Sequence, residues 1–428
     1  MIIVDSALKR RQAEKRPIRV GLIGAGYMGQ GIATQIEKHV TGMHIAAICN
    51  RTLEKAARAY VEAGVTTSIP VTTVAQLDDA IGKSGYAVTD DPFLLCDSDA
   101  VDVIIEATGD VEFSANVVTR AIEKAKHIVL MNAELDATVG PILKVRADRA
   151  GVVISNADGD QPGVMMNLLR FVEGIGNRPV LAGNIKGLQD RYRTPETQRK
   201  FAEIHHITPK MATSFADGTK ISMENAVVAN ATGFKVGTRG MYGPTCKHVS
   251  ETTHLFPTDQ LLEQGLVDYI LGAEPGPGVF VIGYDDQPVR KDYMKYFKMG
   301  DGPFYVFYTP YHLPHLEVPM TAARAVLFND AATAPIGAPV CEVVAVAKRD
   351  LTKGQALDGI GGFDTYGVID NSRRARKNNE LPMGMAEGCV LLRDITKDQS
   401  ISFDDVDLPA GRMIDELWLE QERYFGLK

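Results

Sequence analysis

Short apolar runs alternate with amphipathic stretches in the first part of the chain. The runs are IRVGLIG, HIAAICN, VDVIIEATG, HIVLMNAE and GVVISN, and the stretch GQGIATQIEKHV between the first two places Ile32 and Ile36 one helical turn apart. Buried apolar strands joined by helices are typical of a parallel sheet that is covered on both faces. Residues 1–155 are therefore predicted to form a doubly wound α/β domain that includes a helical N-terminal arm.

The pattern changes over residues 156–335, where the chain is mixed and rich in Gly, Thr, Asn and Tyr. VFVIGYD, PFYVFYT and LEVPM combine apolar alternation with aromatic or β-branched residues, which favours strands. TSFADGTKISMENAVVANATGF indicates a loop that leads into a helix, with Ser222 as the expected N-cap. This segment is predicted to be a central α+β domain that holds the catalytic groups.

Two stretches after residue 335 resemble each other. CEVVAVAKRDLTKGQAL and GCVLLRDITKDQSISFDDVDLP share an apolar run, Arg-Asp, a hydrophobic residue and Thr-Lys. A repeat of this kind predicts a small β domain with two related halves over residues 336–428. The last stretch, MIDELWLEQERYFGLK, predicts an amphipathic helix that closes this domain.

The charge of the chain limits the kinds of partner. With 46 Lys and Arg against 54 Asp and Glu, the formal net charge is −8, which argues against nucleic acid as the main ligand but allows a local basic pocket. No apolar run approaches the roughly twenty residues of a membrane span, and the N-terminus lacks the apolar core of a secretory signal. Five scattered cysteines are expected to be buried in a reducing environment. We therefore expect a cytoplasmic protein without a membrane partner.

A glycine-rich turn, Gly24-Ala25-Gly26-Tyr27-Met28-Gly29, follows the first predicted strand. In dinucleotide-binding domains the first glycine makes a tight turn and the second lets the backbone approach the pyrophosphate, while the third lets helix and strand pack closely. The strand before this turn and the helix after it make the context specific. Gly24, Gly26, Tyr27, Met28 and Gly29 are therefore predicted to bind a dinucleotide in a Rossmann domain.

The end of the second strand indicates which dinucleotide is bound. An acidic residue about twenty residues past the glycine turn usually holds a ribose hydroxyl, but this chain has Asn50, Arg51 and Thr52 there. An amide, a planar cation and a hydroxyl suit a 2′-phosphate, so NADP(H) is predicted. The alternative is a surface arginine that caps the next helix. Thr108-Gly109 is expected near the nicotinamide ribose, and Asn132 faces the same crevice.

Two carboxylates lie one residue apart in Asp158-Gly159-Asp160, after the fifth strand. Flanked by glycine and proline, they would form a rigid acidic turn that can bind a divalent cation, Mg²⁺ or Mn²⁺, or orient a substrate hydroxyl. Asp158 and Asp160 are thus the candidate metal ligands. The alternative is a solvated turn whose aspartate caps the following helix.

Basic and polar side chains gather in the central segment. GNIKGLQDRYRTP supplies Lys186 and Arg191, and SFADGTKISMEN supplies Ser214, Thr219, Lys220, Glu224 and Asn225. A Gly-Thr-Lys turn that enters a helix suits a phosphate, because backbone N–H groups, a hydroxyl and an ammonium converge there. Lys186 or Lys220 could equally protonate a developing alkoxide. For each residue taken alone, the alternative is a solvated surface side chain.

These motifs carry two resemblances to known families. The Rossmann portion resembles homoserine dehydrogenases, which have Asn-Lys where this chain has Asn132-Ala133 and then Glu134. The order of GAGYMG, NRT, GDQPG, GNIKGLQD, SFADGTK and the repeated tail resembles homoserine-dehydrogenase-like oxidoreductases that end in a SAF (β-clip) domain. Among these it resembles the type II, 1-deoxy-D-xylulose 5-phosphate reductoisomerase-like enzymes.

The second resemblance implies an NADPH-dependent homodimer that acts on a small phosphorylated sugar. Its reaction would convert 1-deoxy-D-xylulose 5-phosphate to 2-C-methyl-D-erythritol 4-phosphate in the methylerythritol phosphate pathway of isoprenoid biosynthesis. The residues then assigned to catalysis are Lys186, Lys220, Asp160 and Glu224, and those assigned to the substrate are Glu134, Asp158, Arg191, Ser214, Thr219 and Asn225. The first alternative is an NAD(P)-dependent dehydrogenase of a sugar acid or a homoserine-like hydroxy acid. The second is a non-catalytic NADP-sensing regulator.

Overall fold

A computed structural model describes residues 4–427, and its internal contacts divide the chain into two compact units. Unit 1 comprises Met1–Asp160, Leu313–Ala334 and Glu416–Glu420, and unit 2 comprises Gln161–His312, Pro335–Asp415 and Gln421–Lys428. Each unit therefore collects segments that are far apart in the sequence. The division into three consecutive domains, 1–155, 156–335 and 336–428, stays a prediction.

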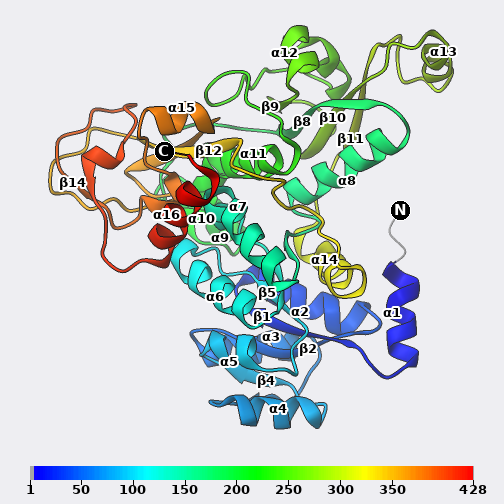
Figure 1. The fold of residues 1–428 in the computed structure, drawn as a ribbon, viewed down its shortest axis with the longest axis vertical. Coiled ribbons are helices and arrows are strands. Elements are labelled where there is room, and N and C mark those ends of the chain that lie inside the picture. The colour runs from blue at the N-terminus through cyan, green and yellow to red at the C-terminus, as the bar shows by residue number, and fades with distance from the viewer. Residues whose placement is uncertain (1–3, 428) are drawn as a thin grey trace. The chain divides into compact units, whose positions relative to one another are not determined.

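Unit 1 contains a seven-stranded parallel sheet with the strand order β3-β4-β2-β1-β5-β6-β7. Figure 1 labels β1, β2, β4 and β5 of this sheet. Its strands are β1 Ile18–Ile23, β2 Met43–Cys49, β3 Ile69–Pro70, β4 Ala87–Thr89, β5 Val103–Glu106, β6 His127–Leu130 and β7 Ile154–Asn156. Its helices are α1 Val4–Ala13, α2 Tyr27–His39, α3 Leu53–Glu62, α4 Val74–Gly82, α5 Pro92–Asp97, α6 Val111–Glu123, α7 Ala133–Ala150 and α14 Pro314–Phe328. The strand order reverses at β1, so the crevice at the carboxyl ends of β1, β2 and β5 is where such a sheet binds its ligand. The predicted parallel α/β sheet is confirmed.

Polar side chains fix where several helices of unit 1 begin. Asp110 accepts a hydrogen bond from the N–H of Phe113 at the start of α6, and Asn132 accepts one from the N–H of Leu135 at the start of α7. Such caps replace the acceptors that the first turn of a helix lacks. At the start of α2 the N-cap residue is Gly26, which offers no side chain to cap the helix.

Helix α14 occupies the position where a strand was predicted for LEVPM. Pro314 begins the helix, and Val318, Ala322 and Ala325 recur at helical spacing and are all buried. The helix packs against α2 and against β6. The strand prediction is wrong because five residues are too few to separate a strand from one face of a helix.

Unit 2 contains a four-stranded mixed sheet with the order β11-β10-β8-β9, in which only β8 and β9 are parallel. Its strands are β8 Arg178–Lys186, β9 Leu266–Leu271, β10 Gly278–Tyr284 and β11 Phe304–Thr309. The helical elements around it are α8 Gln161–Gly174, α9 Arg199–Ile204, α10 Pro209–Ala216, α11 Thr219–Thr232, η1 Val249–His254, α12 Thr258–Glu263 and α13 Pro288–Tyr296. Helices α8 and α11 pack against each other and against β8, so they bring their side chains to this strand.

Helix α11 begins four residues earlier than the sequence predicted, since its N-cap is Gly218 and the expected N-cap was Ser222. Gly218 has a left-handed conformation with φ of +93°, which glycine adopts without steric cost. Ser222, the expected cap, lies inside the helix, and its hydroxyl donates to the carbonyl of Gly367 at 3.2 Å. The N-cap prediction is therefore wrong because the backbone, rather than a serine side chain, makes this turn.

The C-terminal part of unit 2 is built from short β pairs. It contains β12 Cys341–Ala347 paired with β13 Thr365–Asn371, and β14 Val390–Leu391 paired with β15 Val406–Asp407, with the helical elements α15 Ser372–Lys377, η2 Met383–Met385 and η3 Phe403–Asp405. The closing helix is α16 Met413–Phe425. Additional sheets beside the Rossmann sheet are thus present, while the assignment of this part to a SAF domain stays a prediction.

The two copies of the sequence repeat bind each other reciprocally. Leu351 and Ile395, which occupy equivalent positions in the two copies, pair as an antiparallel bridge. Asp350 accepts a backbone N–H of the second copy at 2.8 Å, and Asp394 accepts a backbone N–H of the first copy at 2.8 Å. The repeat that the sequence shows is therefore a pair of β segments that bind each other through a backbone bridge and two reciprocal aspartate hydrogen bonds.

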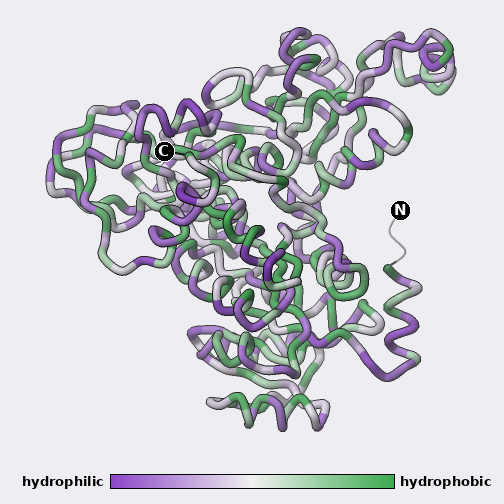
Figure 2. The backbone as a smooth tube through the Cα atoms, in the orientation of Figure 1, coloured by the Kyte–Doolittle hydropathy of each residue, from purple (hydrophilic) through white to green (hydrophobic). Residues whose placement is uncertain are grey.

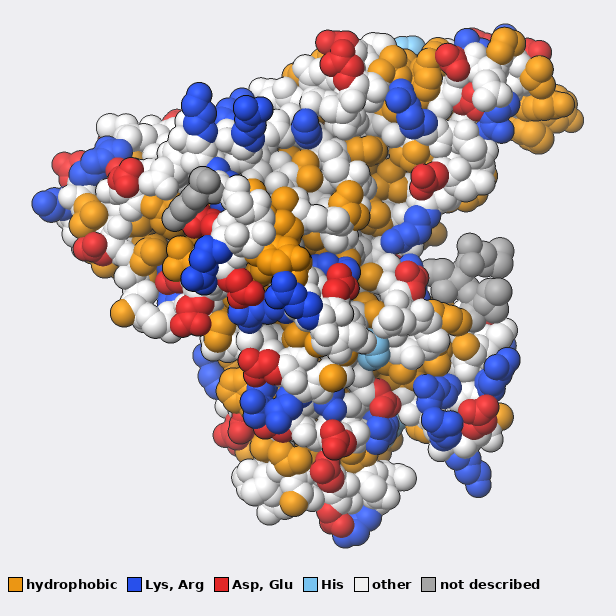
Figure 3. All heavy atoms as spheres, viewed as in Figure 1, with side chains coloured by type: hydrophobic (Ala, Val, Ile, Leu, Met, Phe, Trp, Pro, Cys, Tyr) orange, Lys and Arg blue, Asp and Glu red, His pale blue; other side chains and the backbone are white. Residues whose placement is uncertain are grey.

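Burial follows the hydropathy of the chain closely. In Figure 2 the surface helix α1 is mostly hydrophilic, whereas the strands of unit 1 are hydrophobic. All five cysteines are buried and free, as predicted. In Figure 3 acidic and basic side chains are interspersed over the visible face. On α13, Val289, Tyr293 and Tyr296 are exposed. None of the helices within residues 4–427 is both long and apolar enough to cross a membrane.

Candidate functional site

The glycine turn after β1 leaves room for a ligand at one position and none at the other two. A Cβ atom on Gly24 would lie 2.9 Å from the carbonyl oxygen of Ala107, and one on Gly29 would lie 2.0 Å from the carbonyl oxygen of Gly24. A Cβ atom on Gly26 would meet no atom within 4 Å. The first and third glycines therefore allow close packing, and the second faces open space at the N-terminus of α2. This geometry fits a pyrophosphate, which the helix N-terminus attracts.

The residues after β2 divide between holding the turn and facing solvent. The side-chain oxygen of Asn50 accepts the N–H of Ala25 at 3.0 Å, and its amide donates to the carbonyl of Thr52 at 2.9 Å. Both polar ends of Asn50 thus bind backbone, so this residue holds the glycine turn in place. Arg51 is exposed, and Thr52 is the N-cap residue of α3 without a side-chain capping bond.

The other residues predicted at the cofactor edge lie at the carboxyl ends of β5 and β6. Gly109 has φ of +74°, and a Cβ atom there would again meet no atom within 4 Å. Asn132 caps α7, as described above. Tyr27 is half exposed and stacks edge-on against His315, with ring centroids 6.3 Å apart, and Met28 beside it is partly buried. Open space at both Gly26 and Gly109 is the cradle that a dinucleotide requires along this sheet edge.

The acidic turn after β7 is buried, so the expected alternative of a solvated turn is wrong. Asp158 is 1% exposed, and one of its oxygens lies 3.5 Å from the guanidinium of Arg324. The hydroxyl of Thr321 donates to the other carboxylate oxygen of Asp158 at 3.0 Å, and the backbone N–H of Asp158 donates to the same hydroxyl at 2.7 Å. A carboxylate neutralised in this way is a structural anchor for α14. Asp160 is also buried.

This donor set does not fit a divalent cation. Within residues 4–427, no three His, Cys, Asp or Glu side chains are arranged to hold a metal ion, and the cation beside Asp158 is Arg324. Glu134, in the first turn of α7, is buried as well.

Unit 2 brings together three of the residues that the sequence singled out. The ammonium of Lys186, at the end of β8, lies 3.6 Å from Oε2 of Glu224 on α11. The amide of Asn184 donates to the same Oε2 at 3.1 Å and to Oε1 of Gln161 at 2.6 Å. The amide of Asn225 in turn donates to the side-chain oxygen of Asn184 at 2.7 Å. Lys186 is therefore held by a carboxylate that a network of buried amides orients.

The surroundings of this cluster explain its rigidity. Asn184 and Asn225 are fully buried, and Glu224 is 3% exposed, whereas Lys186 is partly exposed. Buried polar groups that are bonded on several sides hold one geometry, because each alternative leaves a donor or acceptor unpaired. The cluster thus presents one ammonium at its accessible end.

Three of the remaining predicted residues, Thr219, Ser214 and Arg191, make contacts within unit 2. The hydroxyl of Thr219 accepts the N–H of Gly367 at 2.8 Å, and that of Ser214 donates to the carbonyl of Met211 at 2.8 Å. The guanidinium of Arg191, an exposed residue, lies 5.9 Å from the ring centroid of Tyr366. Lys220, the first helical residue after Thr219, is partly buried.

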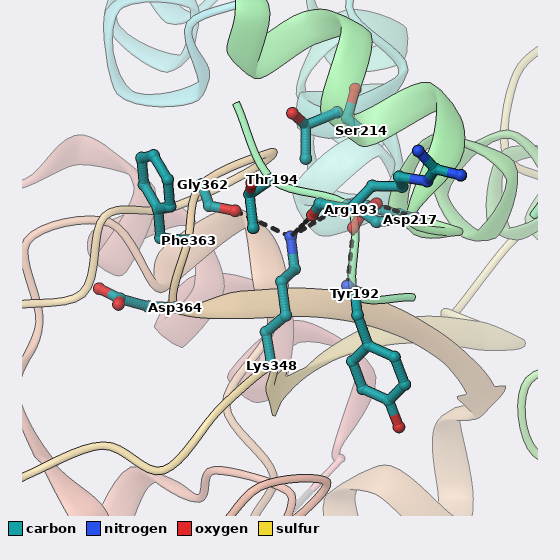
Figure 4. A network of polar contacts seen from close by, with 12 residues as sticks. Tyr192, Arg193, Thr194, Ser214, Asp217, Lys348, Gly362, Phe363 and Asp364 are labelled. Atoms are coloured by element: carbon teal, nitrogen blue, oxygen red, sulfur yellow. Dashed lines mark hydrogen bonds and ion pairs between the residues drawn. The ribbon is translucent and has the colours of Figure 1, made fainter. Parts of the chain in front are cut away.

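A buried lysine that sequence reasoning missed explains the SFADGTK turn (Figure 4). Lys348 extends from the C-terminal β part, and its ammonium donates to Asp217 at 3.0 Å and to the carbonyls of Arg193 and Gly362, both at 2.8 Å. Burial raises the pKa of Asp217, and the ammonium of Lys348 opposes that shift. The turn is therefore anchored from within by Lys348.

Asn184 and Glu106 were also missed, although the sequence held a signal for each. Asn184 precedes Lys186 by two residues in a strand, so both side chains lie on one face of β8. Glu106 follows three apolar residues, Val103-Ile104-Ile105, in a run of strand length, where a carboxylate is expected to be buried.

Two segments of the chain match known protein families. Residues 24–153 match the NAD binding domain of homoserine dehydrogenase. Residues 24–153 are thus an NAD-binding Rossmann domain. Residues 159–318 match the catalytic domain of oxidoreductase DRL, so both segments are similar to oxidoreductases.

Curated relatives match over part of their length. Homoserine dehydrogenase of Bacillus subtilis is 29% identical over 136 residues, which are 32% of this chain and 28% of the relative. Inositol 2-dehydrogenase 4 of Saccharopolyspora erythraea is 32% identical over 93 residues, 22% of each chain. The chain thus spans about a quarter of the length of these relatives. The solved homoserine dehydrogenase of Thiobacillus denitrificans is 13% identical, with a TM-score of 0.44 over 90% of this chain and 97% of that one.

These comparisons correct the family expected from the sequence. The resemblance to 1-deoxy-D-xylulose 5-phosphate reductoisomerase-like enzymes, and with it the reductoisomerase reaction and the place in isoprenoid biosynthesis, is wrong, because the curated relatives are named homoserine and inositol dehydrogenases. The motif that carried the phosphate argument, SFADGTK, is anchored by Lys348 and Gly367. The alternative of a dehydrogenase agrees better with the matches.

Proposed function

We propose that this protein is an NAD(P)-dependent dehydrogenase that interconverts an alcohol and a carbonyl group on a small polar compound of the homoserine, sugar-acid or polyol type. The dinucleotide supplies or accepts the hydride. The observation that carries the proposal is the Lys186–Glu224 pair in its network of buried amides. It is supported by the match of residues 159–318 to an oxidoreductase catalytic domain and by the dehydrogenase names of the curated relatives.

Lys186 serves as the proton donor in this proposal. As the hydride reaches the carbonyl carbon, the carbonyl oxygen gains negative charge, and the Lys186 ammonium donates a proton to it, which yields the alcohol. Glu224 and Asn184 orient the ammonium. An ammonium held in advance also stabilises the developing charge without reorganisation.

NADP(H) is the proposed dinucleotide. The three positions directly after β2 are Asn50, Arg51 and Thr52, in place of an acidic residue that would repel a 2′-phosphate, and Arg51 is exposed beside the glycine turn that Asn50 holds. A guanidinium binds phosphate through two parallel hydrogen bonds. The homodimer expected from the sequence stays a prediction.

The proposal is tested by assaying the purified protein with NADP⁺ and with NAD⁺ against L-homoserine, myo-inositol and a set of sugar acids, following the absorbance of the reduced nicotinamide. We expect turnover of at least one compound, and a loss of about a hundredfold or more in kcat for Lys186→Met. Lys200→Met, which changes an exposed lysine, is the matched control. Unchanged kcat in Lys186→Met would contradict the role of Lys186 as proton donor. Dinucleotide binding without turnover of any of these compounds would contradict the proposal that the protein is a dehydrogenase.

A further inference from the structure

A buried carboxyl group lies next to the glycine turn of unit 1. Glu106 is the last residue of β5 and pairs with Ile23, the last residue of β1, in the register of the sheet. It is 0% exposed. The next residues along the chain pack against Gly24, where a Cβ atom would lie 2.9 Å from the carbonyl oxygen of Ala107 and 3.3 Å from Cγ2 of Thr108. Any shift of Glu106 is therefore transmitted to the glycine turn.

The two oxygens of Glu106 have different surroundings. Oε1 accepts the N–H of Thr108 at 2.8 Å and also accepts the Thr108 hydroxyl. Oε2 is buried without a hydrogen-bond partner among residues 4–427. A buried carboxylate oxygen without a donor is costly, and burial raises the pKa of Glu106 accordingly.

A chain of hydrogen bonds leads from the next strand to Glu106. The amide of Asn132 donates to the hydroxyl of Ser114 at 3.1 Å, and the hydroxyls of Ser114 and Thr108 lie 3.2 Å apart. The orientation of the Asn132 amide is set because its oxygen caps α7 at the N–H of Leu135. The Ser114 hydroxyl therefore donates its hydrogen bond to the Thr108 hydroxyl, which in turn donates to Oε1 of Glu106.

We propose that Glu106 is a positioning residue of the dinucleotide site, which anchors the Thr108–Gly109 turn through the chain from Asn132 and Ser114. The chain joins the ends of β5 and β6 to the first turns of α6 and α7. It holds in place the segment whose Gly109 faces open space at the sheet edge. A dinucleotide that lies along this edge meets a turn already in its bound shape, which lowers the entropy cost of binding. The proposal concerns dinucleotide binding, so it does not depend on which substrate is turned over.

Three variants separate an anchoring acceptor from simple filling of space. Glu106→Gln keeps an acceptor oxygen for Thr108 and is neutral, Glu106→Met keeps the volume without an acceptor, and Ser114→Ala interrupts the chain. The matched control is Ser98→Ala, which removes a buried hydroxyl that donates to Asp78 at 2.5 Å near the opposite end of β5. All are compared by fluorescence titration with NADPH in the absence of substrate, and by urea unfolding without NADPH.

We expect the Kd for NADPH to rise about tenfold in Glu106→Met and in Ser114→Ala, because each loses hydrogen bonds of the chain. Glu106→Gln should stay within about twofold of the native Kd. Ser98→Ala should be less stable to urea without a change in Kd. The proposal is overturned if Glu106→Met binds NADPH like the native protein, if Glu106→Gln is as weak as Glu106→Met, or if Ser98→Ala weakens binding equally. A native protein that binds NADPH but turns over no alcohol would contradict the proposed function and leave this test intact.

Discussion

The ammonium of Lys186 lies 3.6 Å from Oε2 of Glu224, an oxygen that also accepts the amide of Asn184. The lysine ends strand β8 and the glutamate lies on helix α11, so two elements far apart in the sequence meet at one ion pair. Because Glu224 is 3% exposed, its negative charge is screened little by solvent and holds the ammonium strongly.

Replacing Glu224 should therefore change the chemical step more than substrate binding. In Glu224→Gln the amide cannot hold the Lys186 ammonium by charge, and we expect kcat to fall by roughly tenfold to a hundredfold with a smaller change in KM. Steady-state kinetics with the compound identified as substrate measure both constants. Glu263→Gln, on α12, is the control. An increase in KM alone would show that Glu224 binds substrate rather than orienting Lys186.

Arg51 should set the preference for the phosphorylated dinucleotide. Arg51→Ala is expected to raise the Kd for NADPH by about tenfold to a hundredfold, because charge-assisted hydrogen bonds to a phosphate are lost. The Kd for NADH should stay nearly unchanged. Arg58→Ala removes an exposed arginine of α3 that pairs with Glu62, so it controls for net charge. If Arg51→Ala weakened NADPH and NADH equally, the arginine would not bind the 2′-phosphate.

Asp136 should make folding sensitive to pH. Burial raises the pKa of this α7 carboxyl from 3.8 to about 7, while the amide of Asn156, at 3.4 Å, opposes the shift. A raised carboxyl pKa favours the folded state below the unfolded pKa of 3.8, and this contribution is lost as the pH rises toward about 7. Asp136→Asn should therefore be more stable than the native protein at about pH 8, by up to about 4 kcal/mol, and gain nothing at about pH 4.

Urea unfolding of both proteins across this pH range measures the difference. The surface variant Asp407→Asn should follow the native curve. A constant difference between Asp136→Asn and the native protein at every pH would contradict the role of ionisation.

The buried pair of Lys348 and Asp217 should be among the most sensitive positions of unit 2. Lys348→Met or Asp217→Asn alone leaves a buried group without its partner, and we expect a loss of about 3–5 kcal/mol in the free energy of unfolding. The double variant should lose less than the sum of the two. The same changes at Lys83 and Asp79, a surface pair with side chains 72% and 63% exposed, should cost less than about 1 kcal/mol. Additive losses at the buried pair would mean that the two charges do not interact.

Local patterns in the sequence were enough to predict the Rossmann sheet and the glycine turn. Short-range rules about burial predict strands from apolar runs of strand length. Rules about glycine geometry likewise predict that Gly24 and Gly29 pack against backbone and that Gly26 faces open space. The repeat after residue 335 was equally visible. Lys186 and Glu224 could be selected as polar residues of the right chemistry, although nothing in the sequence pairs them.

The tertiary structure alone decided which side chains meet. LEVPM lies in helix α14 because its apolar residues face α2 and the sheet of unit 1, a partner that no local window contains. Asn50 binds the glycine turn, Asp158 binds Arg324, and Lys348 reaches Asp217 across 131 residues. The sequence by itself determined the elements and the kind of cofactor fold, since those depend on neighbours along the chain. The roles of the polar residues depend on partners brought in by folding, and for that reason only the structure could assign them.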